Sequence, residues 1–268
     1  MTFVRIGGVA HHVTVEGTGP VCVLSAGLGL SWFDWDPVVP LLAPHRTVVR
    51  FDRPGHGLSA PAAAPPTAAG EADRIAALLD ALGADHQDPV TVVGHSLAGF
   101  HAEAFARLHP ARTAGLVLVD SSVEEHPRPA RTDAVSRALG RALCAAGLPA
   151  ALGPAVRRAA VRSDPESKAL VRRVYRTSRV LRGALHENAH YGAVAAELLD
   201  LRDRFPLPPG LPVTVLAAPD GSARWERRQR ALARRLGASY EAAVPSGHLV
   251  MLDRPDAVAR AVLSTIRS

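Results

Sequence analysis

Ser96 lies in a sequence pattern that is typical of catalytic nucleophiles. It follows the apolar run 90–93 and is enclosed by the small residues Gly94, Ala98 and Gly99. This pattern predicts a sharp turn between a strand and a helix, which exposes the serine hydroxyl at the edge of a sheet. Small residues are needed because strand and helix pass close together there. The common pattern has glycine two residues after the serine, where this chain has Ala98.

A serine hydroxyl becomes a useful nucleophile when a base removes its proton and a third group orients that base. The candidate base is His248, which follows the last apolar run of the chain in a Ser-Gly-His sequence. The preferred acid is Asp220, because it follows the run 213–216 and gives the chain order serine, acid, histidine. Asp120, which ends the run 116–119, is the alternative acid. Together these residues predict nucleophilic attack on a carbonyl group.

Seven short apolar runs predict strands that would place these residues at one edge of a sheet. Most are continuous rather than alternating, as expected for strands that are buried on both faces. A helical pattern at Ala72–Leu82 separates two of them, and such alternation indicates a mostly parallel sheet. The first runs lie too close together for helical crossovers and predict antiparallel hairpins. The runs are Val13–Val15, Val21–Leu24, Thr47–Phe51, Val90–Val93, Leu116–Val119, Val213–Leu216 and Tyr240–Val244.

The alternation stops between Ser121 and Pro212, where the patterns are helical only. One predicted helix carries Val135, Leu139 and Leu143, a second begins near residues 164–166 and ends at Gly183, and a third covers residues 184–204. We therefore expect a core domain of residues 1–121 and 207–268. Residues 122–206 would form a helical cap over the carboxyl edge of its sheet.

Composition narrows the class of protein. The chain has 268 residues, of which 47% are hydrophobic, enough for one sizeable domain with an insertion or for two small domains. Its two cysteines predict no disulfide framework, and no cysteine–histidine spacing predicts a metal site. The first residues lack a signal-peptide pattern, and no apolar run is long enough to span a membrane. We therefore expect a cytoplasmic protein that does not enter the membrane.

The positive charge is concentrated in the predicted cap. Residues 123–205 contain 15 Lys and Arg against 9 Asp and Glu, whereas the rest of the chain contains 16 of each. This excess of six accounts for the whole formal charge of +6 and favours either a solvated arginine-rich surface or attraction for an anionic substrate or acidic partner. Nucleic acid is not an expected partner, because the chain has no recognised nucleic-acid module and few aromatic residues to stack on bases.

Five segments in order make the chain resemble the α/β-hydrolases, in the branch with a helical cap between the sixth and seventh strands. The segments are Ser25–Gly29, Phe51–Ser59, Gly94–Gly99, Gly115–Ser121 and Ser246–His248. The resemblance implies an α/β fold with a mostly parallel eight-stranded sheet, helices on both faces and the cap after strand six. It also implies a triad of Ser96, His248 and an acid, and hydrolysis without a cofactor or metal.

The resemblance further implies an oxyanion hole built from the backbone N–H groups of Leu97 and Leu28. The family usually has a His-Gly pair before the second of these donors, where this chain has Ala26-Gly27. The resemblance assigns residues 51–59, which include Asp52, Arg53 and His56, to a structural loop. His95 is expected to point away from Ser96.

These features predict a serine hydrolase that cleaves an ester, thioester or lactone through an acyl-enzyme, with a small-molecule ester as the default substrate. The basic cap makes an acyl chain on an acidic acyl carrier protein an alternative. A serine at residue 96 argues against epoxide or carbon–halogen cleavage, for which relatives use aspartate. Two alternatives of other classes stay open: a ligand-binding or receptor-like protein, and a cofactor-free oxygenase or lyase using the same triad.

Overall fold

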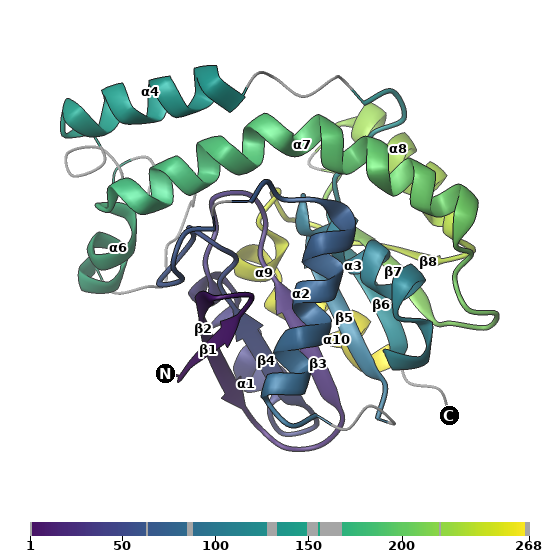
Figure 1. Cartoon of the computed structure of the whole chain (residues 1–268). Helices are drawn as coiled ribbons and strands as arrows, with labels where there is room; N and C mark the ends of the chain where they lie inside the picture. The colour runs from purple at the N-terminus through teal and green to yellow at the C-terminus, as the bar shows by residue number, and fades with distance from the viewer. Residues whose placement is uncertain are drawn as a thin grey trace.

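In this computed structural model, eight strands form a single sheet in the order β1-β2-β4-β3-β5-β6-β7-β8 (Figure 1). The strands are β1 (Thr2–Ile6), β2 (Val9–Glu16), β3 (Val21–Ser25), β4 (Thr47–Phe51), β5 (Val90–His95), β6 (Thr113–Val119), β7 (Val213–Ala217) and β8 (Ser239–Ala242). The structure describes residues 2–62, 64–84, 88–127, 133–148, 155, 168–219 and 221–265.

The sheet is parallel except at one edge. β1 pairs with β2 and β2 with β4 in antiparallel fashion, whereas β4, β3, β5, β6, β7 and β8 run parallel to their neighbours. The predicted mostly parallel sheet with an antiparallel start is therefore confirmed. β1 was not among the expected runs, because Arg5 interrupts its apolar residues and the strand is largely exposed at the edge of the sheet. β5 occupies a central position, so the segment that follows it emerges at the middle of the carboxyl edge.

Helices cover both faces of the sheet (Figure 1). The longer core helices are α2 (Ala68–Ala81), α3 (Ala98–Leu108), α8 (Ala223–Leu236) and α10 (Pro255–Ser264). The shorter elements are η1 (Trp32–Trp35), α1 (Val39–Leu42), η2 (Pro110–Arg112) and α9 (Val250–Asp253). The helix predicted at 72–82 begins earlier, at Ala68, because the Thr67 side chain accepts a hydrogen bond from the Gly70 N–H and caps it.

Alternate residues of each central strand enter two separate cores. Val23 and Val92 pack in one core with side chains of α2 and α3, including Ile75 and Phe105. Leu24 and Val93 enter the other core, which contains residues of α1, α9 and α10 such as Val258. Burial on both faces explains why the strands appear in the sequence as continuous apolar runs.

Among the described residues, three helices lie between β6 and β7, where the insertion was expected. They are α4 (Asp133–Ala145), α6 (Lys168–Tyr175) and α7 (Ser178–Arg204), and α7 crosses above the carboxyl edge of the sheet (Figure 1). The expected second start at residues 164–166 lies outside the described residues.

Gly183 does not end a helix, contrary to the prediction. The break falls earlier, where Thr177 accepts a hydrogen bond from the Val180 N–H and starts α7, which then continues through Gly183. A Cβ at residue 183 would lie only 2.8 Å from the carbonyl oxygen of Gly55. Glycine is therefore used here for close contact between a cap helix and a core loop, rather than as a helix stop.

The cap is joined to the core by polar and apolar contacts. Glu197 of α7 accepts hydrogen bonds from the first two N–H groups of α2, at 2.6 and 3.1 Å. Arg202 of α7 forms an ion pair of 2.7 Å with buried Glu103 of α3. Trp32 and Phe33 of η1 pack against Val174 and Val180 of the cap. These contacts hold α7 over the sheet edge where Ser96 is located.

No helix in the described parts of the chain is long and apolar enough to cross a membrane.

Candidate active site

Ser96 occupies the turn between β5 and α3. Its φ is +52°, a left-handed conformation that is rare for residues other than glycine and that marks local strain. Backbone hydrogen bonds to the neighbouring strand hold this turn, because the Ser96 N–H donates to the Val119 carbonyl and the Ser122 N–H donates to the Ser96 carbonyl. The strained turn lifts the side chain of Ser96 away from the sheet edge.

Two glycines around Ser96 are required by close contacts. A Cβ at Gly94 would lie 2.3 Å from the Ala98 carbonyl oxygen, because the first turn of α3 passes directly over the end of β5. A Cβ at Gly99 would lie 2.0 Å from the hydroxyl of Ser121. Ala98 is completely buried, so the methyl group of alanine fits at residue 98. Glycine is required at residue 99 instead, because α3 packs closely against Ser121 there.

The structure brings His248 to Ser96 across 152 residues of sequence. His248 lies in the loop between β8 and α9, and its Nε2 is 3.0 Å from the Oγ of Ser96. The loop is held by Asp253, whose carboxylate accepts a hydrogen bond from the Gly247 N–H at 2.8 Å. The side chain of His248 is 52% exposed, so one side of the imidazole is open to an incoming molecule.

The other ring nitrogen of His248 is paired with Asp120. The distance from His248 Nδ1 to Asp120 Oδ2 is 2.6 Å, and the carboxylate is buried. Its second oxygen accepts hydrogen bonds from the Ala218 N–H at 2.9 Å and the Trp225 Nε1–H at 2.7 Å. The carboxylate, which directly follows β6, is thus fixed in place by groups from the segment after β7 and from α8. Asp220, the preferred acid from the sequence, lies outside the described residues, and the pairing favours the alternative, Asp120.

His95, the residue before Ser96, also contacts His248. It is almost completely buried, its Nε2 lies 2.8 Å from the carbonyl oxygen of His248, and the two ring centres are 4.7 Å apart. Burial, together with the nearby His248, lowers the pKa of His95 to about 3. The imidazole is therefore neutral at neutral pH, and an N–H at Nε2 donates to the carbonyl. No local pattern in the sequence indicates this contact, apart from the position of His95 directly before Ser96.

The loop that contains Leu28 lies against Ser96. A Cβ on Gly27 would be 3.0 Å from the Cβ of Ser96 and 2.7 Å from the Nδ1 of His95, so the loop backbone approaches the serine as closely as glycine permits. Leu97, the other residue expected to donate an N–H, directly precedes α3 and is almost fully buried. The residues expected to form an oxyanion hole therefore come from segments that meet at Ser96.

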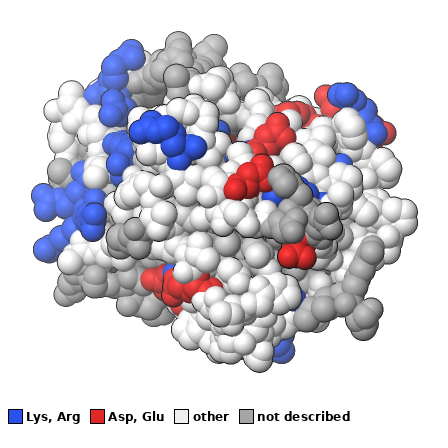
Figure 2. Space-filling model, turned by 60° about the horizontal axis from the view of Figure 1, so that its bottom comes forward, with Lys and Arg blue, Asp and Glu red and all other residues white. Residues whose placement is uncertain are grey.

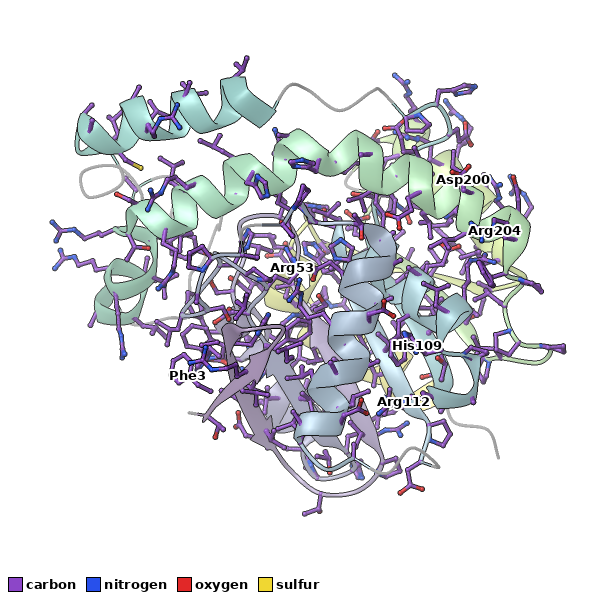
Figure 3. All side chains as sticks on the ribbon, in the orientation of Figure 1. Phe3, Arg53, His109, Arg112, Asp200 and Arg204 are labelled. Atoms are coloured by element: carbon purple, nitrogen blue, oxygen red, sulfur yellow. The ribbon has the colours of Figure 1, made fainter. Side chains whose placement is uncertain are left out.

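Arg53, which lies beneath the cap, forms hydrogen bonds to the loop that contains Leu28. Its guanidinium donates hydrogen bonds to the carbonyl oxygens of Ala26 and Gly27, the latter at 2.9 Å. It also pairs with Glu187 of α7 through contacts of 2.6 and 2.9 Å. Figure 3 shows Arg53 between α7 and the sheet. Burial alone would raise the pKa of Glu187, but Arg53 lowers it to about 2. The sequence carries no local signal for this pair, which joins residues 134 apart.

Asp52 and His56, also expected to be structural, support the same loop region. The Asp52 carboxylate accepts hydrogen bonds from the Trp32 N–H and the Leu58 N–H at 3.0 Å each, and contacts His12 Nδ1 at 2.9 Å. His56 lies 3.4 Å from Glu187, and burial lowers its pKa. Their positions are consistent with a loop that is held in a fixed shape.

Comparisons with known proteins agree with this architecture. Residues 22–261 match the profile of the alpha/beta hydrolase family. A thermophilic esterase from Thermogutta terrifontis superposes with a TM-score of 0.76 at 22% identity, covering 98% of this chain and 97% of the other. At that identity the match shows the shared fold.

Curated relatives match shorter segments. An uncharacterised protein of Mycobacterium tuberculosis is 33% identical over 121 residues, which are 45% of this chain and 35% of that protein. A pimeloyl-[acyl-carrier protein] methyl ester esterase of Chromobacterium violaceum is 36% identical over 130 residues, 48% of this chain and 46% of that protein. The matched regions thus span between a third and a half of these relatives. The family profile covers most of the chain and agrees with the sheet order and the insertion after β6, and on these grounds the chain belongs to the α/β hydrolase family.

Proposed function

We propose that this protein is a serine hydrolase that cleaves carboxylic esters through an acyl-enzyme on Ser96. The observation that carries the proposal is the continuous chain of contacts from Asp120 to His248 Nδ1, at 2.6 Å, and from His248 Nε2 to Ser96 Oγ, at 3.0 Å. A serine is activated when an oriented imidazole can take its proton. In this proposal the triad acid is Asp120.

The stabilisation of negative charge is assigned to the N–H groups of Leu97 and Leu28. The peptide between Gly27 and Leu28 is planar, so its carbonyl and its N–H point in opposite directions. The Gly27 carbonyl is turned towards Arg53 and the Leu30 N–H. The Leu28 N–H is therefore directed away from Arg53. Two such donors matter because removal of one typically costs about 10²–10³ in rate.

The reaction follows from these positions. His248 removes the proton of Ser96 as the serine oxygen bonds to the ester carbonyl carbon, and the carbonyl oxygen gains the negative charge. The tetrahedral centre then expels the alcohol, which takes the proton from His248. Water, deprotonated by His248, attacks the acyl-Ser96 in turn and releases the acid, and the proton returns to the serine. Asp120 stabilises the imidazolium that forms at each stage.

The substrate class proposed is a small carboxylic ester, with thioesters and lactones as chemically related substrates. The chain has a serine at the nucleophile position, and one of its relatives is named a methyl ester esterase. In this arrangement, residues 1–121 and 207–268 form the catalytic core and residues 122–206 the cap. The cap would shape the space above the half-exposed imidazole of His248 and so select among esters.

Activity assays of the Ser96→Ala variant test this proposal. Wild-type protein should hydrolyse some members of a panel of short-chain esters, thioesters and lactones. The Ser96→Ala variant should lose at least about 10³-fold in rate but have the same free energy of unfolding as wild type. A fluorophosphonate should label Ser96, as located by mass spectrometry of the peptides. Stoichiometric labelling without turnover on the panel would favour a ligand-binding protein. Turnover that survives Ser96→Ala would contradict the acyl-enzyme.

A carrier-bound acyl substrate is a second candidate because the cap surface carries an exposed basic cluster. Arg172 and Arg173 of α6 and the adjacent Arg176 are all exposed. Figure 2 shows Lys and Arg side chains gathered on the left of the molecule, the side on which α6 lies in Figure 1. An acidic acyl carrier protein would complement this cluster. Replacing the three arginines by glutamate should then raise KM for carrier-bound esters and leave small esters unaffected, whereas equal effects on both would exclude this candidate.

A further inference from the structure

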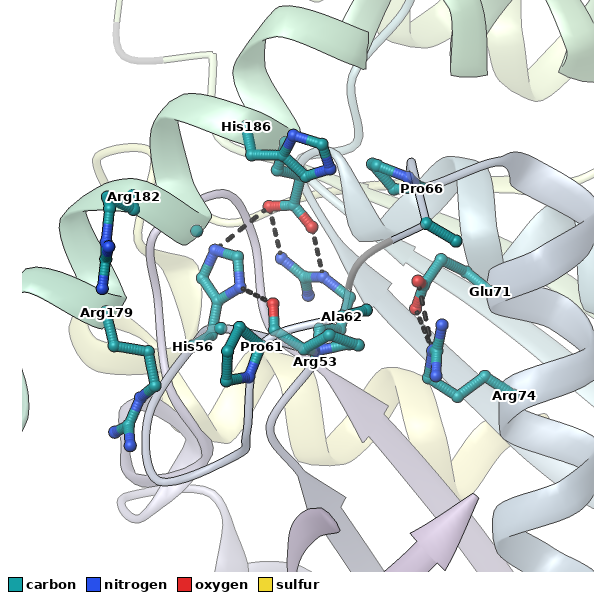
Figure 4. Close-up of a pocket in the computed structure, with 15 residues that line it drawn as sticks. Arg53, His56, Pro61, Ala62, Pro66, Glu71, Arg74, Arg179, Arg182 and His186 are labelled. Atoms are coloured by element: carbon teal, nitrogen blue, oxygen red, sulfur yellow. Dashed lines mark hydrogen bonds and ion pairs between the residues drawn. The ribbon is translucent and has the colours of Figure 1, made fainter. Parts of the chain in front are cut away.

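A cavity of about 350 Å³ lies on the flank of the molecule, between the first half of α7 and the loop 53–66 (Figure 4). The residues that line it do not include Ser96, His248 or Asp120. Its volume lies in the range of small-molecule sites. The apolar part of its lining is formed by Pro54, Pro61, Ala62, Ala64 and Pro66. The remaining lining residues are mostly charged, and their pairing indicates what the cavity would hold.

Both acidic side chains of the lining are already paired. Glu187 is paired with Arg53, and buried Glu71 lies 3.2 Å from the Nε of Arg74. Figure 4 shows the Glu71–Arg74 pair on one side of the cavity, Arg179 and Arg182 on the other, and Arg53 between them. The acidic groups therefore neutralise the guanidinium groups on one side and at the centre.

The two arginines on the other side have no acidic partner among the described residues. Arg179 donates to the Gly57 carbonyl, and Arg182 donates from Nε to the Ser178 carbonyl at 3.3 Å. Within the described residues, the Nε of Arg179 is also buried without a hydrogen-bond partner. Arg179 is half-buried, and this burial lowers the pKa of its guanidinium, whereas the charge of Asp52 acts to raise it. Two guanidinium groups that form no ion pair with a described residue make this cavity wall attractive to an anion.

The place of Arg179 in its helix gives a second, independent indication. Arg179 is in the first turn of α7, a helix of 27 residues that has no acidic residue in that turn. The N-terminal end of a helix carries partial positive charge, which disfavours cations and favours anions. An arginine in this position therefore adds to, rather than offsets, the positive potential at the cavity.

We propose that this cavity is a binding site for a small organic anion, separate from the catalytic serine. A carboxylate or phosphate head group would bind Arg179 and Arg182, and a short apolar body would lie against the prolines and alanines of the loop. Both head groups are anions whose oxygen atoms accept hydrogen bonds from guanidinium groups. They differ in total charge and in geometry. The proposal does not depend on the reaction assigned to Ser96.

Calorimetric titration of the Ser96→Ala protein tests this site without turnover. The probes are butyrate and butyl phosphate, with neutral butyramide as the control, all at constant ionic strength. The anions should bind with Kd of about 1 mM or tighter, and butyramide should bind at least about tenfold more weakly. The tighter of the two anions identifies the preferred head group. Equal binding of butyramide, or no binding of either anion at ten times that concentration, would overturn the proposal.

Matched variants locate the binding. Arg182→Gln removes an exposed guanidinium with little risk to folding, and Arg179→Gln removes the partly buried one; each should weaken anion binding by about tenfold. The control is Arg172→Gln with Arg173→Gln, which removes the same charges from nearby exposed positions that do not line the cavity. Equal losses in this control would mean that the anion responds to the overall charge of the cap, and the assignment would be wrong. Urea unfolding confirms that each variant is folded.

Discussion

The Nε2–H of His95 donates a hydrogen bond to the backbone carbonyl of His248, with 2.8 Å between the two heavy atoms. His95 is the last residue of β5, in the middle of the sheet, whereas His248 belongs to a loop near its far edge. The bond therefore ties the loop to a central strand, directly beside Ser96. It gives His95 a positioning role in the proposed mechanism.

Replacing His95 should reduce turnover more than it affects substrate binding. In His95→Ala the loop loses a hydrogen bond worth about 0.5–1.5 kcal/mol, so we expect kcat to fall by about tenfold with little change in KM. His95→Gln keeps a side-chain N–H and should recover part of the loss. The rate of fluorophosphonate labelling of Ser96 should fall in parallel with kcat. An unchanged labelling rate in a folded His95→Ala protein would show that the contact has no positioning role.

Substitution of the two candidate acids distinguishes Asp120 from Asp220. Asp120→Asn keeps an oxygen for the Ala218 and Trp225 donors but loses the carboxylate that orients the Nδ1–H of His248. We expect kcat/KM to fall by about 10³–10⁴, as in other triads that lose this group. Asp220→Asn should change kcat/KM by less than about threefold. The opposite ranking of the two variants in the same ester assay would assign the acid to Asp220.

Local sequence patterns predict the nucleophile and the base of the candidate triad but do not distinguish between its two candidate acids. Ser96 and His248 can be predicted because the sequence features that mark them are local. Gly94 and the end of a strand mark Ser96, and a Ser-Gly-His loop after a strand marks His248. Asp120 and Asp220 follow β6 and β7, which are neighbours in the sheet, so both have the same local signal. The pairing of Asp120 with His248 depends on Trp225, which reaches it from α8, 105 residues away. No local pattern reports such a contact.

Gly183 illustrates the same limit in the cap. The alternation of strands and helices predicted the sheet and the position of the insertion correctly. Within the insertion, a glycine in a helical pattern is a reasonable place for a helix to end. The helix instead continues, because Gly183 is required where α7 contacts Gly55 of a core loop. The pair of Arg53 and Glu187 was missed for a similar reason. These contacts form between segments that meet only in the folded chain.

Removing the charge of Glu187 should destabilise the protein strongly. Glu187→Gln leaves the buried guanidinium of Arg53 without a counter-charge, which typically costs about 3–5 kcal/mol in the free energy of unfolding. The double variant Arg53→Met, Glu187→Met should be more stable than Glu187→Gln, because no unpaired charge stays buried. Its kcat/KM for esters should nevertheless be low, since the carbonyl groups of Ala26 and Gly27 lose their donor.

Urea unfolding and ester hydrolysis measured on the same preparations separate these two effects. Glu226→Gln is the matched control, because Glu226 forms a more exposed pair with Arg230 and its loss should cost less than about 1 kcal/mol. A double variant with normal kcat/KM would show that Arg53 contributes to stability but not to the shape of the loop beside Ser96.

Buried neutral histidines should make the protein less stable in mild acid. Burial is the largest cause that lowers the pKa of His101 to about 3 and that of His11 to about 4, against about 6.5 in an unfolded chain. Between pH 6.5 and these lower values the unfolded state binds more protons than the native state. The free energy of unfolding must therefore fall as the pH falls through this window, by up to about 1.4 kcal/mol per pH unit for each such histidine.

The His101→Leu variant measures how much one of these histidines contributes to the pH dependence of stability. In the described part of the chain, neither ring nitrogen of His101 has a hydrogen-bond partner, so leucine of similar size should leave stability at pH 7 unchanged or higher. Between pH 6 and pH 4 the variant should lose stability less steeply than wild type, by about 1.4 kcal/mol per pH unit. Urea unfolding at pH 7, 6, 5 and 4 measures both slopes. Parallel slopes for the two proteins would mean that His101 is already protonated in the native state, which its almost complete burial opposes.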